Sequence, residues 1–447
     1  MDPAILAAYD RPVPRYTSYP TAAQFSADVG TAQHWDWLRD LNGQSAVLYL
    51  HVPFCRELCW YCACHTMAMR RPGTLEAYGD ALAEELLRIK HAAPGLCIDG
   101  IQWGGGTPGQ LGPARLRRLG RRIAMLFDRR SDAEISFELD PRHCTGDLAE
   151  AIAEIGVNRV SLGVQDFDPA VQKAINRLQS FEVTATAIGL LRSEGVKRFS
   201  IDLVYGLPAQ TLESLDRTVD QALKLGATRF AVFGYAHVPW MKPHQKLIDE
   251  AWLPGAAARS AMADLVANRL VDAGYVKIGL DHYARPDDAL AVAAQAGQLH
   301  RNFQGYVTDR SPWVVGVGAS AISSLPRGFV QNITDPAFYM SRIETGELAT
   351  ARGLPLSDDD RLRAAIIQNL ICQNHVDIGS QCARFNVDPD AFIASIEDLP
   401  KLERDGLIVR DKREIDVTGD GLPLVRFVCA AFDRHYTGEA GKHSRGI

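Results

Sequence analysis

Between about residues 46 and 240, the chain alternates short apolar runs with longer amphipathic stretches. Six runs rich in β-branched and aromatic residues are typical of buried strands: Ala46–His51, Gly100–Trp103, Glu134–Glu138, Arg159–Gly163, Phe199–Leu203 and Phe230–Tyr235. Between them, apolar residues recur at helical spacing in segments such as 74–91, 113–127, 181–193 and 212–225. Strands that alternate with helices of this length predict parallel β/α units.

Six such units are too few for the eight strands of a closed barrel. The pattern therefore predicts an α/β fold built on a partial (β/α)6 TIM-like barrel. We expect residues 46–350 to hold this barrel with an extension. Residues 1–45 would form an N-terminal arm over the active site, and residues 351–447 a small, mostly helical, winged-helix-like domain.

Polar or glycine-rich features stand at the end of every predicted strand. They are the cysteine-rich loop after the first strand, Gly104–Pro108, Glu138–Pro141, Gln165–Asp166, Asp202 and Tyr235–His237. In β/α barrels the reacting groups cluster at the carboxyl ends of the strands. We therefore expect these features to face one cavity.

The cysteine-rich loop has the spacing C-x3-C-x2-C at Cys55, Cys59 and Cys62. A cubane 4Fe-4S cluster normally takes four thiolates, so a loop that commits three leaves one iron open to another ligand. Electron carriers usually close that position. The spacing therefore indicates a cluster that takes part in chemistry.

Other interpretations of the cysteines stay open. Structural zinc usually draws its ligands from two separated pairs, and no second C-x2-C pair follows downstream. Cys64 can complete a four-cysteine set, although side chains two positions from a neighbour in a locally extended loop are hard to converge with it. A disulfide is less favoured, because the chain starts without a basic segment and apolar run, and we expect a cytoplasmic protein in a reducing compartment.

The composition is that of an ordinary globular protein, with 47% hydrophobic and 23% charged residues in 447. The net charge of -6 lacks the basic surplus of a general nucleic-acid binder. No apolar run approaches the roughly 20 residues of a membrane-spanning helix. We expect a small-molecule substrate, no nucleic acid and no membrane span.

The glycine run Gly104–Gly106 has a simple interpretation as a tight turn before a helix. Its place directly after a strand favours close approach of the backbone to a ligand. The spacing is neither a dinucleotide-binding G-x-G-x-x-G nor a P-loop. Its backbone groups can instead hold the amino-acid part of a cofactor.

Two regions flank the predicted barrel. The arm segment Arg11–Pro20 has three prolines and two tyrosines, which predicts an extended chain wrapped over the core, with a disordered tail as the alternative. The stretch Leu356–Phe432 contains a helix at Asp360–Leu370, the segment Leu402–Arg410 and a short strand pair. Because it has no basic surplus, we expect a lid or packing domain and not a DNA-binding unit.

Taken together, these motifs resemble the radical S-adenosylmethionine (SAM) superfamily and, within it, the oxygen-independent coproporphyrinogen III oxidases, also called coproporphyrinogen III dehydrogenases. The resemblance covers nearly the whole chain, and the cysteine motif alone fixes only the superfamily. The matching segments are Pro14–Thr21, His51–Cys55, Cys62–Cys64, Trp103–Pro108, Gly163–Phe167, Asn176–Arg177, Tyr235–Pro239, Asn302–Tyr306, Gly316–Ile322 and Leu424–Arg426.

The resemblance implies an enzyme whose 4Fe-4S cluster is held by Cys55, Cys59 and Cys62, with SAM on the fourth iron. A 5'-deoxyadenosyl radical would take hydrogen from a propionate of coproporphyrinogen III, and loss of carbon dioxide and an electron would leave a vinyl group. Two propionates are converted, which gives protoporphyrinogen IX in anaerobic haem (porphyrin) biosynthesis. A reducing electron donor, an unidentified electron acceptor and a monomeric state are also implied.

Two SAM molecules are implied, with contacts that carry over to single positions. The first would contact Tyr49, Gly105, Glu138 and Ile322. The second would contact Tyr61, Gly106, Thr107, Gln165, Arg177, Asp202 and Ala236. Arginine can pair with a carboxylate and the acids can accept from ammonium or hydroxyl groups, although each charged residue taken alone is more often part of a surface ion pair.

Three further residues are candidates for the reaction itself. Cys64 matches the fourth cysteine of the family signature, and we expect it to matter for turnover. Tyr16 and Arg15 would lie on the substrate side, because a tetracarboxylate needs hydroxyl and cationic partners. Two alternatives remain: a haem-binding chaperone of the same superfamily, whose members lack this cysteine and arm, and a radical methylase.

Overall fold

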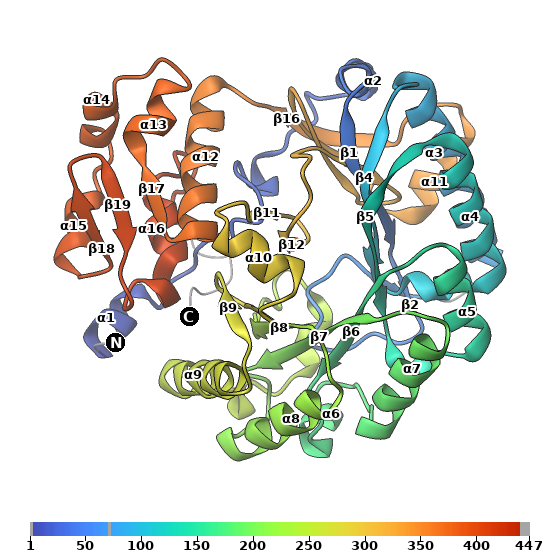
Figure 1. Ribbon diagram of the computed structural model, residues 1–447, viewed down its shortest axis with the longest axis horizontal. Helices are drawn as coiled ribbons and strands as arrows, with labels where there is room; N and C mark the ends of the chain where they lie inside the picture. The colour runs from blue at the N-terminus through green and yellow to red at the C-terminus, as the bar shows by residue number, and fades with distance from the viewer. Residues whose placement is uncertain (1–2, 70–72, 439–447) are drawn as a thin grey trace.

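A computed structural model describes residues 3–69 and 73–438 of the chain. Its centre is one mixed sheet of 12 strands in the order β16-β15-β14-β13-β1-β4-β5-β6-β7-β8-β10-β9 (Figure 1). Because β16 and β9 are its two ends, the sheet stays open. The predicted partial barrel is confirmed.

Six strands of this sheet are the predicted ones, and each pairs in parallel with the next. They are β1 (Ser45–Val52), β4 (Cys97–Gly105), β5 (Asp128–Leu139), β6 (Arg159–Gln165), β7 (Arg198–Tyr205) and β8 (Arg229–Gly234). Helices link them and line the outside of the curved sheet (Figure 1). These are α3 (Gly73–Ala92), α4 (Pro113–Leu126), α5 (Gly146–Glu154), α6 (Pro169–Ala174), α7 (Phe181–Ser193) and α8 (Leu212–Lys224), followed after β8 by α9 (Ala256–Asp272).

The sheet extends beyond the predicted strands at both edges. One edge adds β13 (Val314–Val317), parallel to β1, and then the antiparallel β14 (Ile322–Leu325), β15 (Gly328–Asn332) and β16 (Thr350–Pro355). The other adds β10 (His282–Ala284) and β9 (Val276–Ile278). The remaining elements before the C-terminal part are α10 (Ala289–Gln295), α11 (Pro336–Glu344), the strand pairs β2 (Phe54–Cys55) with β3 (Met67–Ala68) and β11 (His300–Asn302) with β12 (Gly305–Val307), and the 3-10 helices η2 (Pro108–Leu111), η3 (Pro141–His143), η4 (Pro243–Leu247) and η5 (Glu250–Trp252).

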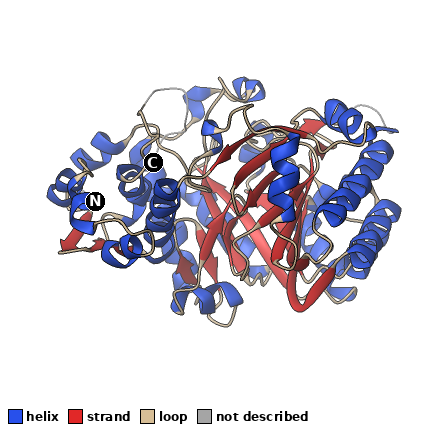
Figure 2. Ribbon diagram, turned by 90° about the horizontal axis from the view of Figure 1, so that it is seen from above, coloured by secondary structure: helices blue, strands red, loops and turns tan. Residues whose placement is uncertain are grey.

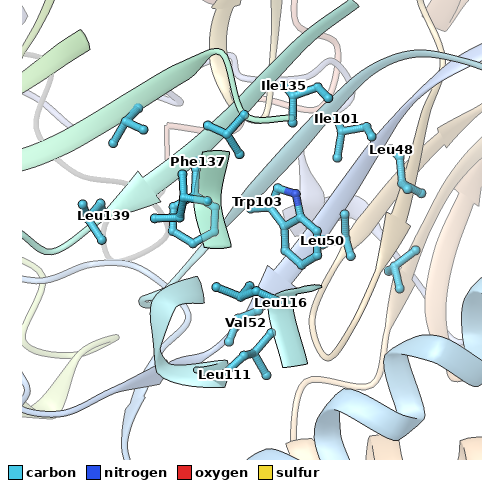
Figure 3. Close-up of a cluster of buried hydrophobic side chains, with 14 of the residues drawn as sticks. Leu48, Leu50, Val52, Ile101, Trp103, Leu111, Leu116, Ile135, Phe137 and Leu139 are labelled. Carbon is cyan, nitrogen blue, oxygen red and sulfur yellow. The ribbon is translucent and has the colours of Figure 1, made fainter. Parts of the chain in front are cut away.

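Alternation along the strands separates the core from the site. Figure 3 shows apolar side chains of β1, β4 and β5 packed beneath η2 and α4, among them Leu48, Leu50, Val52, Ile101, Trp103, Leu111, Leu116, Ile135, Phe137 and Leu139. All ten are at most 5% exposed, and each such burial stabilises the fold by roughly 1.5–3 kcal/mol. Successive side chains of a strand point to opposite faces, so the residues between them, such as Tyr49 and Glu138, point into the barrel.

The C-terminal part is mostly helical and lies beside the sheet (Figure 2). It comprises α12 (Asp358–Gln373), α13 (Ile378–Ala383), α14 (Pro389–Ala394), α15 (Leu399–Arg404), η6 (Leu422–Leu424), α16 (Val425–Ala431) and a small sheet of β17 (His375–Asp377), β19 (Glu414–Val417) and β18 (Ile408–Asp411). The helix and hairpin expected from the sequence are both present. No helix within residues 3–69 and 73–438 is long and apolar enough to cross a membrane.

The N-terminal arm is ordered and partly helical. It contains α1 (Pro3–Tyr9), η1 (Ala22–Gln24) and α2 (Thr31–Arg39), while the Pro-rich segment between α1 and η1 is extended as expected. Tyr9, Tyr16 and Tyr19 are at most 5% exposed and belong to the same buried cluster as the core of the C-terminal part. Both chain ends accordingly lie on the helical side of the molecule (Figure 1).

Candidate active site

The cysteine-rich loop leaves β2 at Cys55 and returns at β3, which pairs with β2. One support comes from the segment after α6, where the Trp60 amide donates to the Ile175 carbonyl at 3.0 Å and Asn176 Nδ2 to the Leu58 carbonyl at 3.0 Å. This contact fixes the first half of the loop against the barrel.

A second support comes from η4, after β8. Gln245 Nε2 donates to the Tyr61 carbonyl at 2.9 Å, His244 Nε2 lies 2.7 Å from the Cys62 carbonyl oxygen, and Lys242 Nζ donates to the Cys64 carbonyl at 2.8 Å. Nothing in the sequence assigned a role to residues 242–245. In the structure they hold three of the four loop positions from 61 to 64.

Polar groups surround the first two thiols. Cys55 Sγ is hydrogen-bonded to Thr66 Oγ1 at 3.0 Å and lies 3.6 Å from Thr107 Oγ1. Cys59 Sγ accepts from Arg177 Nη1 at 3.5 Å and from Arg142 Nη2 at 3.8 Å. Cations beside a sulfur favour the thiolate, which is the form that binds metal.

The thiols of Cys62 and Cys64 face the same space and are hydrogen-bonded to each other. This contact raises the pKa of Cys62 well above its ordinary value and lowers the pKa of Cys64 to about 7. Cys64 is enclosed by protein yet keeps accessible surface, because it borders an open interior space. All nine cysteines are free thiols.

The arrangement of these thiols suits a cluster better than one ion. Among residues 3–69 and 73–438, no three His, Cys, Asp or Glu side chains gather around one point. A single zinc ion requires such convergence. A cubane cluster instead offers each thiolate a separate iron, so thiols spread along a loop fit it.

Arg177 connects the loop to the barrel interior. It is 6% exposed, donates through Nη2 to the Gly163 carbonyl at 2.6 Å, and pairs through Nη1 with Asp140 Oδ2 at 3.5 Å. Arg142 Nη2 also pairs with Asp140 Oδ2, at 2.6 Å. Burial alone would raise the pKa of Asp140, but the two guanidiniums hold it at about 2. Arg177 is therefore not a surface ion pair, and Asp140 and Arg142 are site residues that the sequence did not single out.

Two buried acids point inward from β5 and β7. Glu138 Oε2 accepts from the Gly105 amide at 3.0 Å, and burial raises the pKa of this carboxyl to about 8. Asp202 Oδ1 accepts from Ser161 Oγ at 3.0 Å, and burial raises its pKa to about 6. An ammonium group beside either acid would stabilise its charged form.

The glycine run is imposed by its neighbours. Gly105 has a φ of +114°, and a Cβ there would lie 2.7 Å from the ring of His51. A Cβ at Gly106 would lie 2.7 Å from Thr66 Oγ1. The amides of Gly105 and Gly106 donate to Glu138 and to the Val52 carbonyl, so the expectation that these N–H groups are open to a ligand is wrong.

The other predicted contacts of the second SAM molecule lie around the same interior. Gln165 ends β6 with a φ of +71°, a conformation that few residues other than glycine adopt. Thr107 is buried with its hydroxyl toward Cys55. Burial raises the pKa of Tyr61 well above its ordinary value, against the effect of Arg177, and the Ala236 carbonyl accepts from Gln245 Nε2 at 3.2 Å.

A small cavity of about 210 Å³ lies at the start of β14. Tyr49 and Ile322 line it, together with His51, His65 and residues 302–304. Gln304 Nε2 is buried there without a hydrogen-bond partner, which suits a polar ligand. The segment around Gln304 had no predicted role, because only the fold brings it opposite β1.

A second cavity, of about 910 Å³, opens beyond the ends of β7 and β8. Arg15 and Ala236 line it. Tyr16 does not, because its hydroxyl donates to Asp433 Oδ2 at 3.1 Å in the core of the C-terminal part. The expectation that Tyr16 faces the substrate is therefore corrected: its side chain attaches the arm.

Comparison with known proteins identifies the family. The model of the Radical SAM superfamily matches residues 49–222. A protein of Bradyrhizobium diazoefficiens named oxygen-independent coproporphyrinogen III oxidase is 47% identical over 437 residues, 97% of each chain. The chain belongs to the oxygen-independent coproporphyrinogen III oxidase family. The resemblance noted in the sequence is confirmed.

Two further relatives of the family agree along almost their full length. The Pseudomonas aeruginosa protein of the same name is 39% identical over 440 residues, 97% of this chain and 96% of that one. The solved coproporphyrinogen III oxidase of Escherichia coli, described as a radical SAM enzyme, has a TM-score of 0.90 at 37% identity and covers 94% of this chain and 98% of its own. The chain is thus a radical SAM enzyme of this family.

Family membership implies a 4Fe-4S cluster and SAM. The residues present fit both groups, since the loop supplies thiols with cationic neighbours while buried acids and an unpartnered amide face the adjoining spaces.

Proposed function

We propose that the protein converts two propionate side chains of coproporphyrinogen III to vinyl groups, giving protoporphyrinogen IX in anaerobic haem biosynthesis. The observation that carries this proposal is the cysteine loop placed beside a cavity of about 910 Å³ in a chain whose full-length relatives bear that name. A cavity of that volume is at the upper end of small-molecule sites, which suits a macrocycle.

Cys55, Cys59 and Cys62 are the proposed cluster ligands. When bound, the cluster and SAM supply a 5'-deoxyadenosyl radical by one-electron cleavage of the sulfonium. The chain holds the loop rigid from both sides and places Arg142 and Arg177 beside the sulfur of Cys59. These cations offset negative charge on the thiolate during reduction by an external electron donor.

Two SAM sites are part of the proposal. Tyr49, Glu138 and Ile322 surround the small cavity or its floor, where the Glu138 carboxylate can accept from an ammonium group. Arg177 and Asp202 offer a guanidinium and a carboxylate for the second molecule. Tyr61, Gln165, Thr107 and the backbone of Gly105, Gly106 and Ala236 complete the two proposed sites.

The proposed reaction removes one hydrogen atom from each reacting propionate and releases its carboxylate as carbon dioxide. The electron left behind passes to an acceptor, and the bond between the two side-chain carbons becomes a vinyl double bond. Arg15 and Cys64 are the proposed residues on the substrate side. We also propose a monomer in the cytoplasm, divided into an arm (1–45), a barrel (46–350) and a C-terminal domain (351–447).

The test is anaerobic reconstitution with iron and sulfide, followed by reaction with SAM, a reductant and coproporphyrinogen III. We expect mass analysis to show protoporphyrinogen IX, with two carbon dioxide molecules released per tetrapyrrole. Retention of haem without a vinyl product would favour a chaperone, and methyl transfer to the tetrapyrrole would favour a methylase.

Cys59→Ala tests the ligand assignment within the same assay. The variant should lose most of its iron and its visible absorption, because two thiolates hold a cubane poorly. Cys97→Ala is the matched control, since Cys97 starts β4 outside the loop, and it should keep the full iron content. Full iron retention by Cys59→Ala would remove Cys59 from the ligand set.

A further inference from the structure

The large cavity is assembled from parts of the chain that are far apart in sequence. The ends of β7 and β8 contribute Tyr205 and Gly234, the arm contributes Arg15, and α16 contributes Arg426. Arg15 Nη2 donates to the Gly234 carbonyl at 3.3 Å, so the arm is joined to the barrel at this wall. Whatever binds here contacts the barrel, the arm and the C-terminal part together.

Three guanidiniums and one acid form a cluster in this wall. Arg301 pairs with Asp281 at 3.3 Å and lies 4.5 Å from the centre of the Tyr306 ring. Asp281 also binds His282 Nδ1, at 2.6 Å. Arg15 and Arg426 add two positive charges beside this pair, and the cluster therefore carries more cations than it has acids to balance.

The rest of the lining is balanced in charge. Three basic side chains, Arg11, Arg259 and Lys277, stand against three acidic ones, Asp10, Glu250 and Asp264. The surplus of the cavity is thus concentrated where Arg15 and Arg426 lie.

Crowding of these cations is consistent with a missing anion. Burial and the nearby Arg15 and Arg301 lower the pKa of Arg426 to about 10, and burial lowers the pKa of Arg15. Arg15 is surrounded by protein yet its side chain is accessible, because the cavity reaches it. Guanidinium groups in such a setting bind carboxylates in bidentate fashion.

We propose that Arg15 and Arg426 bind the two propionate carboxylates that the tetrapyrrole keeps, an assignment that rests on the proposed function. A guanidinium stabilises a carboxylate relative to neutral carbon dioxide, so a clamp on a reacting propionate would oppose its decarboxylation. The same clamp on a retained propionate fixes the macrocycle without that penalty. Two surplus positive charges match two retained carboxylates.

This assignment predicts equal effects on substrate and product. Both keep the same two propionates, so loss of the clamp should weaken both to the same extent. A clamp on the reacting propionates would weaken the substrate alone.

The experiment is anaerobic equilibrium dialysis without SAM or reductant, using coproporphyrinogen III and protoporphyrinogen IX separately, each quantified after oxidation to its porphyrin. Arg15→Gln and Arg426→Gln should each raise Kd for both ligands at least tenfold, and Arg426→Lys should raise it less. Arg384→Gln is the control, because Arg384 is exposed on the C-terminal part and donates to Gln381, and its Kd values should stay within twofold.

Kd values of Arg15→Gln and Arg426→Gln within twofold of the wild type would overturn the proposal, as would weakening of coproporphyrinogen III alone. If Arg426→Gln lowers the melting temperature strongly, Arg15→Gln decides, since its accessible side chain lies on an extended segment. The dialysis is independent of turnover: arginine-dependent binding with no vinyl product would contradict the proposed reaction, and vinyl product with arginine-independent binding would contradict this inference.

Discussion

Arg177 is the side chain at which the interior of the barrel meets the cysteine loop. It contacts the sulfur of Cys59, the carbonyl of Gly163 and the carboxylate of Asp140, and it is 6% exposed. Its Nε is buried without a hydrogen-bond partner. A buried cation with an open donor is suited to hold the carboxylate of a bound molecule.

Arg177→Ala should leave the iron content unchanged, because the three thiols remain, and should lower product formation by about 100-fold or more through loss of this positioning contact. Iron analysis and anaerobic turnover measure the two effects. Arg198→Ala is the control, since Arg198 is 53% exposed at the start of β7 and should behave as wild type. Unchanged turnover in Arg177→Ala would remove Arg177 from the proposed SAM site.

At the level of single residues, sequence reasoning reached what a motif displays. The cysteine spacing and the glycine run are local, and so they are visible without a fold. Asp140 and Arg142 are visible only in the structure, because their importance comes from packing against Arg177. Tyr16 was misplaced for the same reason: an aromatic hydroxyl beside an arginine does not reveal which of the two turns into the core.

Among the elements, α3 has a second task besides covering the sheet. Its Glu85 is buried and accepts from the Gly318 amide at 2.8 Å, Asn332 Nδ2 at 2.7 Å and the Tyr339 hydroxyl at 2.6 Å. These contacts fix the turn between β13 and β14. The helix therefore sets the position of Ile322, which begins β14 beside the small cavity.

The pH dependence of stability tests this connection. Burial raises the pKa of Glu85 from 4.5 to about 7, so the folded state holds the proton more tightly than the unfolded chain. The stability contributed by protonated Glu85 is present below about pH 4.5 and is lost as the pH rises toward 7, by roughly 3 kcal/mol in all. Glu85→Gln should remove this slope.

Urea unfolding of the cofactor-free protein between pH 5 and 8 measures the effect as the difference between wild type and variant. Glu84→Gln is the matched control, because its side chain is one position away on the same helix and 55% exposed, and its difference from wild type should not vary with pH. A constant difference for Glu85→Gln across this range would contradict the prediction.

The elements themselves divide into predictable and unpredictable ones. The six parallel strands and the helices between them follow from alternating apolar runs that are long enough to show a period. β13 has four residues and no helix of its own before β14, so nothing local distinguishes it from a loop. It becomes a strand because β1 offers it an open edge, a contact between residues more than 260 positions apart.

For the whole molecule, the decisive contacts join the two ends of the chain. The Tyr16 hydroxyl donates to Asp433, the Tyr9 hydroxyl to Asp405 at 2.6 Å, and the Tyr436 hydroxyl to the Pro12 carbonyl at 2.6 Å. The arm thus completes the core of the C-terminal part. Its neighbour Arg15 is left facing the large cavity.

Tyr16→Phe should lower the free energy of unfolding by about 2 kcal/mol, because a buried carboxylate loses a hydrogen-bond donor. Denaturant unfolding measures this loss, and product formation at saturating substrate should stay near the wild-type rate. Arg15→Gln is the adjacent comparison, with the opposite result of retained stability and weakened binding. A Tyr16→Phe variant that keeps full stability but loses turnover would return Tyr16 to the substrate side.

The joining of the two chain ends has a consequence for biosynthesis. Tyr16 leaves the ribosome early and Asp433 417 residues later, so the wall between them does not exist while translation is under way. A nascent polypeptide with a finished barrel would still have no closed chamber for a macrocycle. Loading of the tetrapyrrole is thereby restricted to chains whose synthesis has passed the last helix.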